Sequence, residues 1–249
     1  MFIRLIKIIF FVACFSFFAF QQDFITQQKK CLRVKKAIED KEAFITKKLD
    51  NKQLSKNALN VLVLIFKSEK ILELYVKSKT NTTYELLESY NICAISGELG
   101  PKRKQGDYQT PEGFYHISNF NPNSSYYLSL GINYPNGSDK KKSTASDLGG
   151  DIYIHGECVT IGCVPMTNEK MKEIYLYAMY AKNSGQQKIP VYIFPFKMTD
   201  KNMTAAKESY KNNAQIIEFW KNIKQGFDAF EKDHKELKLS IDKAGNYLF

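Results

Sequence analysis

The sequence predicts an α+β fold in which one large domain carries helical additions. Short apolar runs typical of strands fill the middle of the 249-residue chain, one helical pattern follows a loop rich in Cys and Gly, and helical patterns occupy both ends. We therefore divide the chain into a targeting segment (residues 1–20), a helical segment (21–55), a central domain (56–200) and a C-terminal helical extension (201–249).

The first twenty residues have the pattern of a secretory signal peptide. Arg4 and Lys7 precede the apolar run 8–20, and polar residues then end it. Because residues 2–20 nearly reach spanning length, an uncleaved membrane anchor is the alternative. Either form predicts export to the periplasm or cell envelope, with membrane contact through this segment alone.

The charge balance indicates which partners to expect. The formal net charge is +10, which favours either solubility or attraction to an anionic partner such as the wall or membrane surface. The chain has no helix-turn-helix, RNA-binding or zinc signature and no nucleotide-binding loop. We expect neither nucleic acid, nor a cofactor, nor a metal.

The elements follow in order along the chain. Residues 24–49 are expected to form an approximately amphipathic helix or a spacer leading from the membrane, and a polar turn at 67–70 is expected to join the first two strands as a hairpin. Two loops, 97–110 and 133–150, are rich in Gly, Pro and polar residues, and loops of that length are usually functional or mobile. Strands are expected at 61–66, 71–76, 84–95, 113–118, 126–130, 151–154 and 189–194.

Two more helices complete the prediction. Thr167 is the expected N-cap of the first. Its apolar residues recur at helical spacing, which indicates a buried face: Met171, Ile174, Tyr175, Ala178 and Met179. The second lies in the C-terminal extension and carries the apolar stripe Ile216, Trp220, Ile223, Phe227 and Phe230. We expect it to pack across the sheet.

The most informative stretch runs from Asp151 to Met166. An apolar strand ends in His155, and a short Gly-containing loop then leads to Cys163. Such a loop brings a thiol nucleophile and an imidazole base together, while Gly156 and Gly162 allow tight turns. The alternative is a hairpin with buried cysteines. His155, Cys158 and Cys163 lack the fourth ligand that a zinc site needs.

This stretch resembles the L,D-transpeptidase catalytic domain family, also called YkuD-type, and within it the YafK-like branch. That branch carries Ile-His-Gly-x-Cys-Val-Ser-x-Gly-Cys, which residues 154–163 match with Thr160 in place of Ser. Further blocks at 96–102, 106–115, 134–139 and 193–200 are similar to the family's and occur in its order. The resemblance implies a compact β-sandwich or barrel-like mixed sheet.

The resemblance also implies roles for individual residues. Cys163 would be the nucleophile and His155 the base and acid, with the Gly156 carbonyl fixing the imidazole tautomer. Backbone N–H groups near Gly162 and Cys163 would stabilise the oxyanion. Thr160 either orients the loop or is a structural hydroxyl.

Substrate contacts are expected on the two long loops. Lys102 and Arg103, with the neighbouring Lys104, would meet carboxylates of a wall peptide. Tyr134, Asn136 and Asp139 would line the mouth of the site or bind an amino group. The alternative for each is a solvated loop residue.

The resemblance implies an exported cysteine enzyme that acts on peptidoglycan stem peptides through a thioester. In the YafK-like branch the reaction would be hydrolysis that detaches a wall-anchored lipoprotein from diaminopimelate. Ile161 stands where most of the family has a second His, and Pro165 and Met166 where Arg or Asn is common. These changes favour hydrolysis over cross-linking.

Three alternatives stay open at this point. One is an L,D-transpeptidase that forms cross-links or attaches protein to the wall, and another is a non-catalytic wall-binding protein. The third concerns the cysteines: Cys93 and Cys158 form a disulfide, or they and Cys31 are small buried thiols.

Overall fold

A computed structural model describes residues 23–249 of the chain. The predicted signal peptide or anchor, residues 1–20, lies outside the described residues. Within residues 23–249, none of the helices combines the length and the apolar character that a membrane span requires.

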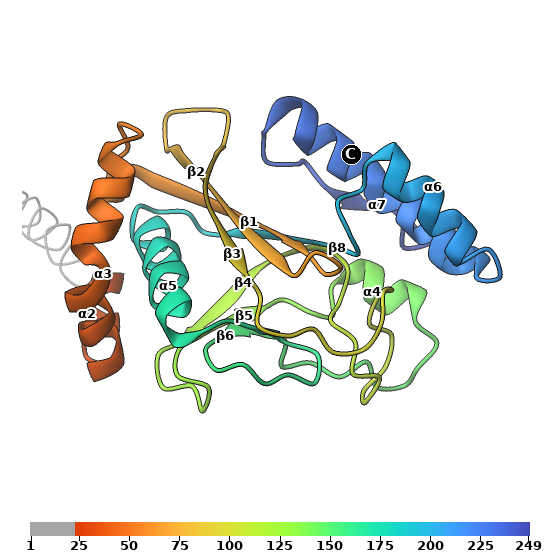
Figure 1. The fold of residues 1–249 in the computed structure, drawn as a ribbon, viewed down its shortest axis with the longest axis horizontal. Helices are drawn as coiled ribbons and strands as arrows, with labels where there is room; N and C mark the ends of the chain where they lie inside the picture. Colours follow the sequence, from red (N-terminus) through yellow and green to blue (C-terminus); the bar gives the residue numbers. More distant parts are fainter. Residues whose placement is uncertain (1–22) are drawn as a thin grey trace, which may run out of the picture.

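The centre of the fold is one mixed sheet of eight strands (Figure 1). Its order is β3-β2-β1-β8-β4-β5-β6-β7, and the β1–β8 and β6–β7 pairs are parallel. The prediction of an α+β fold is confirmed. The strands are β1 (Leu59–Phe66), β2 (Ile71–Ser78), β3 (Glu85–Asn91), β4 (Gly113–Asn121), β5 (Ser129–Ile132), β6 (Tyr153–His155), β7 (Val164–Pro165) and β8 (Pro190–Phe194).

Both faces of the sheet are covered, and β8 is buried along its whole length and β1 almost so. In β1, Val61, Val63 and Ile65 join one core, whereas Leu62 and Leu64 join a second core on the opposite face. This follows from the two-residue period of a strand. A strand buried on both faces reads as a continuous apolar run, which is why β1 was predictable.

Different helices supply the two cores (Figure 1). On one side α5 (Asn168–Asn183) packs on the sheet and α3 (Leu32–Asp50) packs on α5, next to the short α2 (Phe24–Gln28). On the other side lie α6 (Asp200–Ser209) and α7 (Ala214–Asp233). A 3₁₀ turn, η1 (Lys56–Ala58), leads into β1, and a small ribbon of β9 (Ser240–Ile241) and β10 (Tyr247–Leu248) closes the chain.

The predicted N-cap of α5 is present, and α7 is capped by a side chain in the same way. Thr167 caps α5 by accepting a hydrogen bond from the Lys170 N–H at 3.3 Å, as expected. Asn213 likewise caps α7 through the Ile216 N–H at 3.1 Å. Trp220 of α7 is fully buried, and its indole N–H donates to Glu112 at 2.8 Å.

Several predicted boundaries were wrong. The segment 133–150 is not wholly loop, because Asn136 and Asp139 form a capping box that starts the short helix α4 (Gly137–Lys142). The predicted 24–49 helix is two helices separated by a turn at 29–31. The third strand ends at Asn91, short of the expected 95, and β5 begins only at Ser129. Helix α6 was not anticipated as a separate element.

A buried ion pair fixes the loop 97–112 against the sheet. The Lys67 ammonium donates to Glu112 at 2.9 Å and to the carbonyls of Gly100 and Thr110 at 2.8 and 3.0 Å. Glu112 also accepts from the Gly100 N–H at 2.7 Å. Both side chains have no solvent exposure. This network holds both ends of the loop in place beside the candidate site.

Candidate active site

Strand register places His155 and Cys163 on one face of the sheet. In the parallel pair β6–β7, Ile154 lies opposite Val164, and both are fully buried in the core. His155 follows Ile154 and Cys163 precedes Val164. Since side chains alternate between faces, both point away from that core, toward the same side. The register therefore puts both side chains on the same side of β6–β7.

The imidazole of His155 is held in one orientation. Its Nδ1 lies 2.5 Å from the Gly156 carbonyl oxygen, so Nδ1 carries the hydrogen and Nε2 is left as the acceptor. The ring of Tyr126 lies over it, with the two ring centres 4.8 Å apart. Burial lowers the pKa of His155 below its ordinary value. The imidazole is therefore neutral near pH 7 and can accept a proton.

The Cys163 thiol is free and partly exposed. Burial raises the pKa of the thiol; a hydrogen bond from Tyr153 and the charge of Lys102 oppose this, and Asp151 adds to it. The thiol itself donates to the Asp151 carbonyl at 3.4 Å. The sequence argument expected an enhanced thiolate fraction. These pKa shifts instead favour a neutral thiol and a neutral imidazole.

Thr160 and Gly162 shape the turn that presents the thiol. The Thr160 hydroxyl donates to the Cys163 carbonyl at 2.8 Å and accepts from the Gly162 N–H at 3.1 Å. Thr160 thus braces the turn at two points. Gly162 has φ +140°, a conformation open to glycine, and a Cβ there would lie 3.2 Å from the Gln109 carbonyl. Gly156 is different: side-chain atoms of Asn168 and Tyr127 leave no room for a Cβ.

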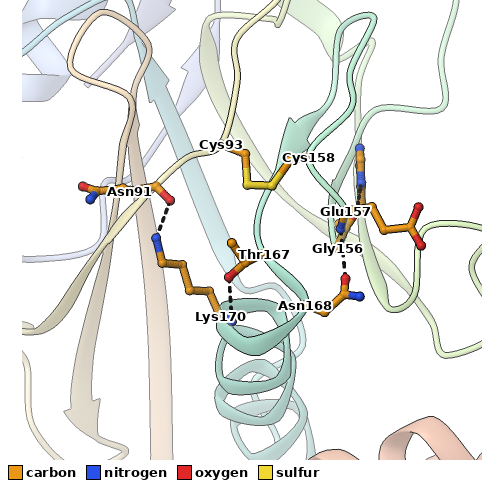
Figure 2. The surroundings of a disulfide bond; sticks show 9 residues. Asn91, Cys93, Gly156, Glu157, Cys158, Thr167, Asn168 and Lys170 are labelled. Carbon is orange, nitrogen blue, oxygen red and sulfur yellow. Dashed lines mark hydrogen bonds between the residues drawn. A yellow bond between two sulfur atoms is a disulfide. The ribbon is translucent and has the colours of Figure 1, made fainter.

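A disulfide joins Cys93 to Cys158, so one of the two expectations for these cysteines is confirmed (Figure 2). It links the chain that follows β3 to the loop between His155 and Cys163. On one side of the bridge Glu157 donates through its backbone N–H to the Asn168 side chain at 3.0 Å, at the start of α5. The disulfide ties the loop to the segment after β3, and the hydrogen bond ties it to the start of α5. Because Cys158 is in the disulfide, it is not available as a metal ligand.

Lys102 and Arg103, predicted to contact substrate, are paired inside the protein. The buried Lys102 ammonium donates to Asp107 at 2.6 Å and to the Lys104 carbonyl at 2.9 Å. Arg103 donates to Asp139 at 3.0 Å and lies over the Phe219 ring. Both residues fix the loop 97–112 from within. The charge of Lys102 still acts on Cys163, as noted above.

Tyr134, Asn136 and Asp139 belong to the same internal cluster. The Tyr134 hydroxyl donates to the Leu148 carbonyl at 3.1 Å, and the Asn136 amide donates to the Phe114 carbonyl at 3.0 Å. Burial raises the pKa of Asp139 to about 6, although the Asn136 N–H and Arg103 oppose the shift. The five predicted binding residues therefore lie in one cluster, and the polar groups named above are hydrogen-bonded to other parts of the protein.

Three residues near the thiol were missed. Tyr126 covers His155, Asp151 accepts from the thiol, and Gln109 abuts Gly162. Tyr126 lies in the polar turn before β5 and Asp151 adopts a positive φ of 54°, so neither had a local sequence signal. Gln109 belongs to a loop block that was recognised, but its contact depends on tertiary folding.

Metal ligation finds no support in the part of the chain that is described. Residues 23–249 contain no cluster of three or more His, Cys, Asp or Glu side chains placed to hold an ion.

The chain is similar to known proteins in sequence and in fold. The sequence model of the YkuD family, described as the L,D-transpeptidase catalytic domain, matches residues 60–193. The "Putative L,D-transpeptidase YafK" of Escherichia coli K12 is 42% identical over 183 residues, which cover 73% of this chain and 70% of that protein. The crystal structure of the helical cell shape determining protein Pgp2 from Campylobacter jejuni matches with 21% identity and a TM-score of 0.44, covering 73% of each chain.

Proposed function

Because this chain belongs to the L,D-transpeptidase catalytic domain family, whose members act on peptidoglycan, we propose that it is an exported cysteine hydrolase of stem peptides. The observation that carries the proposal is the placement of His155 and the free thiol of Cys163 on one face of β6–β7. The proposed bond is the one between a wall-anchored lipoprotein and diaminopimelate.

The neutral pair determines the order of proton transfers. As the Cys163 sulfur attacks the carbonyl carbon next to a D-centre, its proton passes to Nε2 of His155. The carbon–nitrogen bond then breaks, the imidazolium protonates the leaving amine, and a thioester remains on Cys163. Water, deprotonated by the same imidazole, adds to the thioester and releases a carboxylate and the free thiol.

The loop supplies the remaining parts of this mechanism. The Gly162 N–H already donates to the Thr160 hydroxyl. We therefore assign the backbone N–H of Cys163, rather than that of Gly162, to the oxyanion; one such donor typically contributes about 100- to 1000-fold in rate. The Thr160 hydroxyl positions this N–H through its bond to the Cys163 carbonyl.

Hydrolysis is favoured by the side chains around the thiol. Met166 is fully buried and Pro165 is also buried, so neither position can orient an acceptor amine. The exposed neighbours are apolar: Val159 is 55% and Ile161 is 76% exposed. Transfer depends on holding a second reactant in place, whereas water needs little more than the imidazole.

One observation supports the second candidate, transpeptidation. The Asp151 carboxylate is close enough to Cys163 to raise the pKa of the thiol. Asp151 is exposed, and a carboxylate there could hold an acceptor ammonium beside the thioester. Asp151→Asn should then lower the yield of transfer product with little effect on the hydrolysis rate.

The test uses the purified protein with wall-lipoprotein conjugates and muropeptides, and identifies the products by mass. We expect released lipoprotein, and free hydrolysed peptide even with excess acceptor amine. Cys163→Ala should reduce turnover to background. Cys31→Ala is the matched control, because Cys31 is the other free, partly exposed cysteine of the described chain. If cross-linked product dominates, the protein is a transpeptidase rather than a hydrolase. Substrate binding without any turnover would favour a wall-binding protein.

The partner and the location complete the proposal. Stem peptides and the lipoprotein attached to them exist outside the cytoplasm, and the sequence of residues 1–20 predicts export. A reporter fused after Asp23 should be active in the periplasm. Activity restricted to the cytoplasm would contradict this placement.

A further inference from the structure

A groove of about 730 Å³ is lined in part by the loop 97–112. Neither His155 nor Cys163 lines it. Its walls come from the loop, from the end of α4 and from the first turns of α7. A volume of this size suits a small ligand. Its polar and charged lining includes Glu98, Arg103, Gln109, Lys142, Gln215 and Glu218.

One end of the groove is cationic. Arg103 and Lys142 both line it, and burial together with the charge of Arg103 lowers the pKa of Lys142. The hydrogen-bond acceptor of the Lys142 ammonium is a neutral amide, Asn246, at 2.7 Å. Arg103 is paired with Asp139 through Nη1 at 3.0 Å, and a carboxylate placed here would form charge-assisted hydrogen bonds with the other guanidinium nitrogens and with Lys142.

The neighbouring wall carries the opposite charge and apolar surface. Glu98 is exposed and lies close enough to Tyr210 to contribute to that residue's raised pKa, after burial. Ile216 and Phe219 form an apolar floor between the charged groups. The first N–H groups of α7, at Ala214 and Gln215, have no acceptor within the helix and border the same space.

The groove is structurally connected to the thiol turn. Gln109 lines the groove. Its backbone carbonyl oxygen lies 3.2 Å from the position that a Cβ on Gly162 would take. The Gln109 side chain accepts from the Glu98 N–H at 3.1 Å. A ligand in the groove would therefore contact a residue that borders the turn carrying Cys163.

We infer that this groove binds a zwitterionic peptide, a wall stem peptide other than the one that reacts with Cys163, with its carboxylate at Arg103 and Lys142 and an ammonium at Glu98. The identity of the peptide rests on the proposed function. The groove offers two cations, two exposed carboxylates (Glu98 and Glu218) and an apolar floor, which together fit a short zwitterionic peptide better than a glycan or a simple anion.

The test measures binding of the free stem tripeptide ending in diaminopimelate to the Cys163→Ala protein by calorimetry. We expect saturable binding, with an affinity at least fivefold weaker in Lys142→Ala and in Glu98→Gln. A tripeptide with an amidated carboxyl end should not bind in this way. Lys140→Ala, in an exposed lysine of the same helix, should bind as the parent does. Gln215→Trp, which fills the groove from an exposed position, should also weaken binding.

Unaltered binding in Lys142→Ala, or no binding of the tripeptide at millimolar concentration, would overturn the inference. Turnover of the lipoprotein conjugate by the protein with Cys163 intact is measured in parallel. Turnover without tripeptide binding would refute the groove alone. Tripeptide binding that depends on Lys142, without turnover of the conjugate, would support the binding site in the groove and refute the hydrolase proposal.

Discussion

Replacing Gly162 by Ala tests whether the backbone of the thiol turn is what places Cys163. Gly162 has φ +140°, and holding a residue with a side chain in such a region costs about 1–3 kcal/mol. The added Cβ would also lie 3.2 Å from the Gln109 carbonyl, so the turn or the loop must shift by a few tenths of an ångström. For a domain of this size the melting temperature should fall by about 2–12 °C.

The effect on catalysis should exceed the effect on stability. A displacement approaching 1 Å at a reacting group costs about 100-fold in rate. We therefore expect kcat to drop at least about tenfold while KM changes less, in initial-rate assays on the lipoprotein conjugate. Gly150→Ala is the matched control, because its Cβ would meet no atom within 4 Å. Wild-type kcat in Gly162→Ala, or an equal loss in Gly150→Ala, would refute the reasoning.

Three further predictions concern proton transfer, the disulfide and the buried ion pair. Because burial lowers the pKa of His155, activity should rise with pH through a midpoint below about 6.5, the ordinary His value, and an acid limb centred above it would contradict a neutral imidazole base. Cys93→Ser with Cys158→Ser opens a bridge of sequence separation 65 and should reduce the free energy of unfolding by about 4 kcal/mol in urea titrations; an unchanged midpoint would contradict this. Lys67→Met leaves the Glu112 charge buried and should cost about 3–5 kcal/mol, and adding Glu112→Gln should recover part of that loss; strictly additive losses would mean that the two charges are not coupled.

The sequence predicted what depends on local pattern. The continuous apolar run of β1, the helical stripe of α5 and its Thr167 cap are each readable from neighbouring residues. The common side of β6–β7 for His155 and Cys163 was readable because a single loop joins them. The roles of Lys102 and Asp139 were not, because exposed and buried loop charges look alike until their partners Asp107 and Arg103 are known.

Contacts that join distant segments were not predicted, because local sequence does not reveal which segments meet. The Tyr126 ring over His155 and the Gln109 carbonyl against Gly162 bring together loops that no periodicity relates. Asn136 was expected to face substrate, but its side chain caps α4, and the capping box with Asp139 was visible in the sequence as Asn-Gly-Ser-Asp. The start of α4 is therefore encoded locally, unlike the contacts between loops.

The position of β8 has a consequence for the order in which the chain assembles. Among the described strands, β8 is the one that pairs with both β1 and β4, and so joins the β1–β3 hairpins to the strands that carry the thiol. Residues 190–194 follow the whole of α5, so the two halves of the sheet cannot be joined until the chain is complete to Phe194. Late closure over such a long sequence separation slows folding. A chain of this design would therefore present two unjoined sheet edges until Phe194 is in place, and its folding yield should depend on factors that shield strand edges.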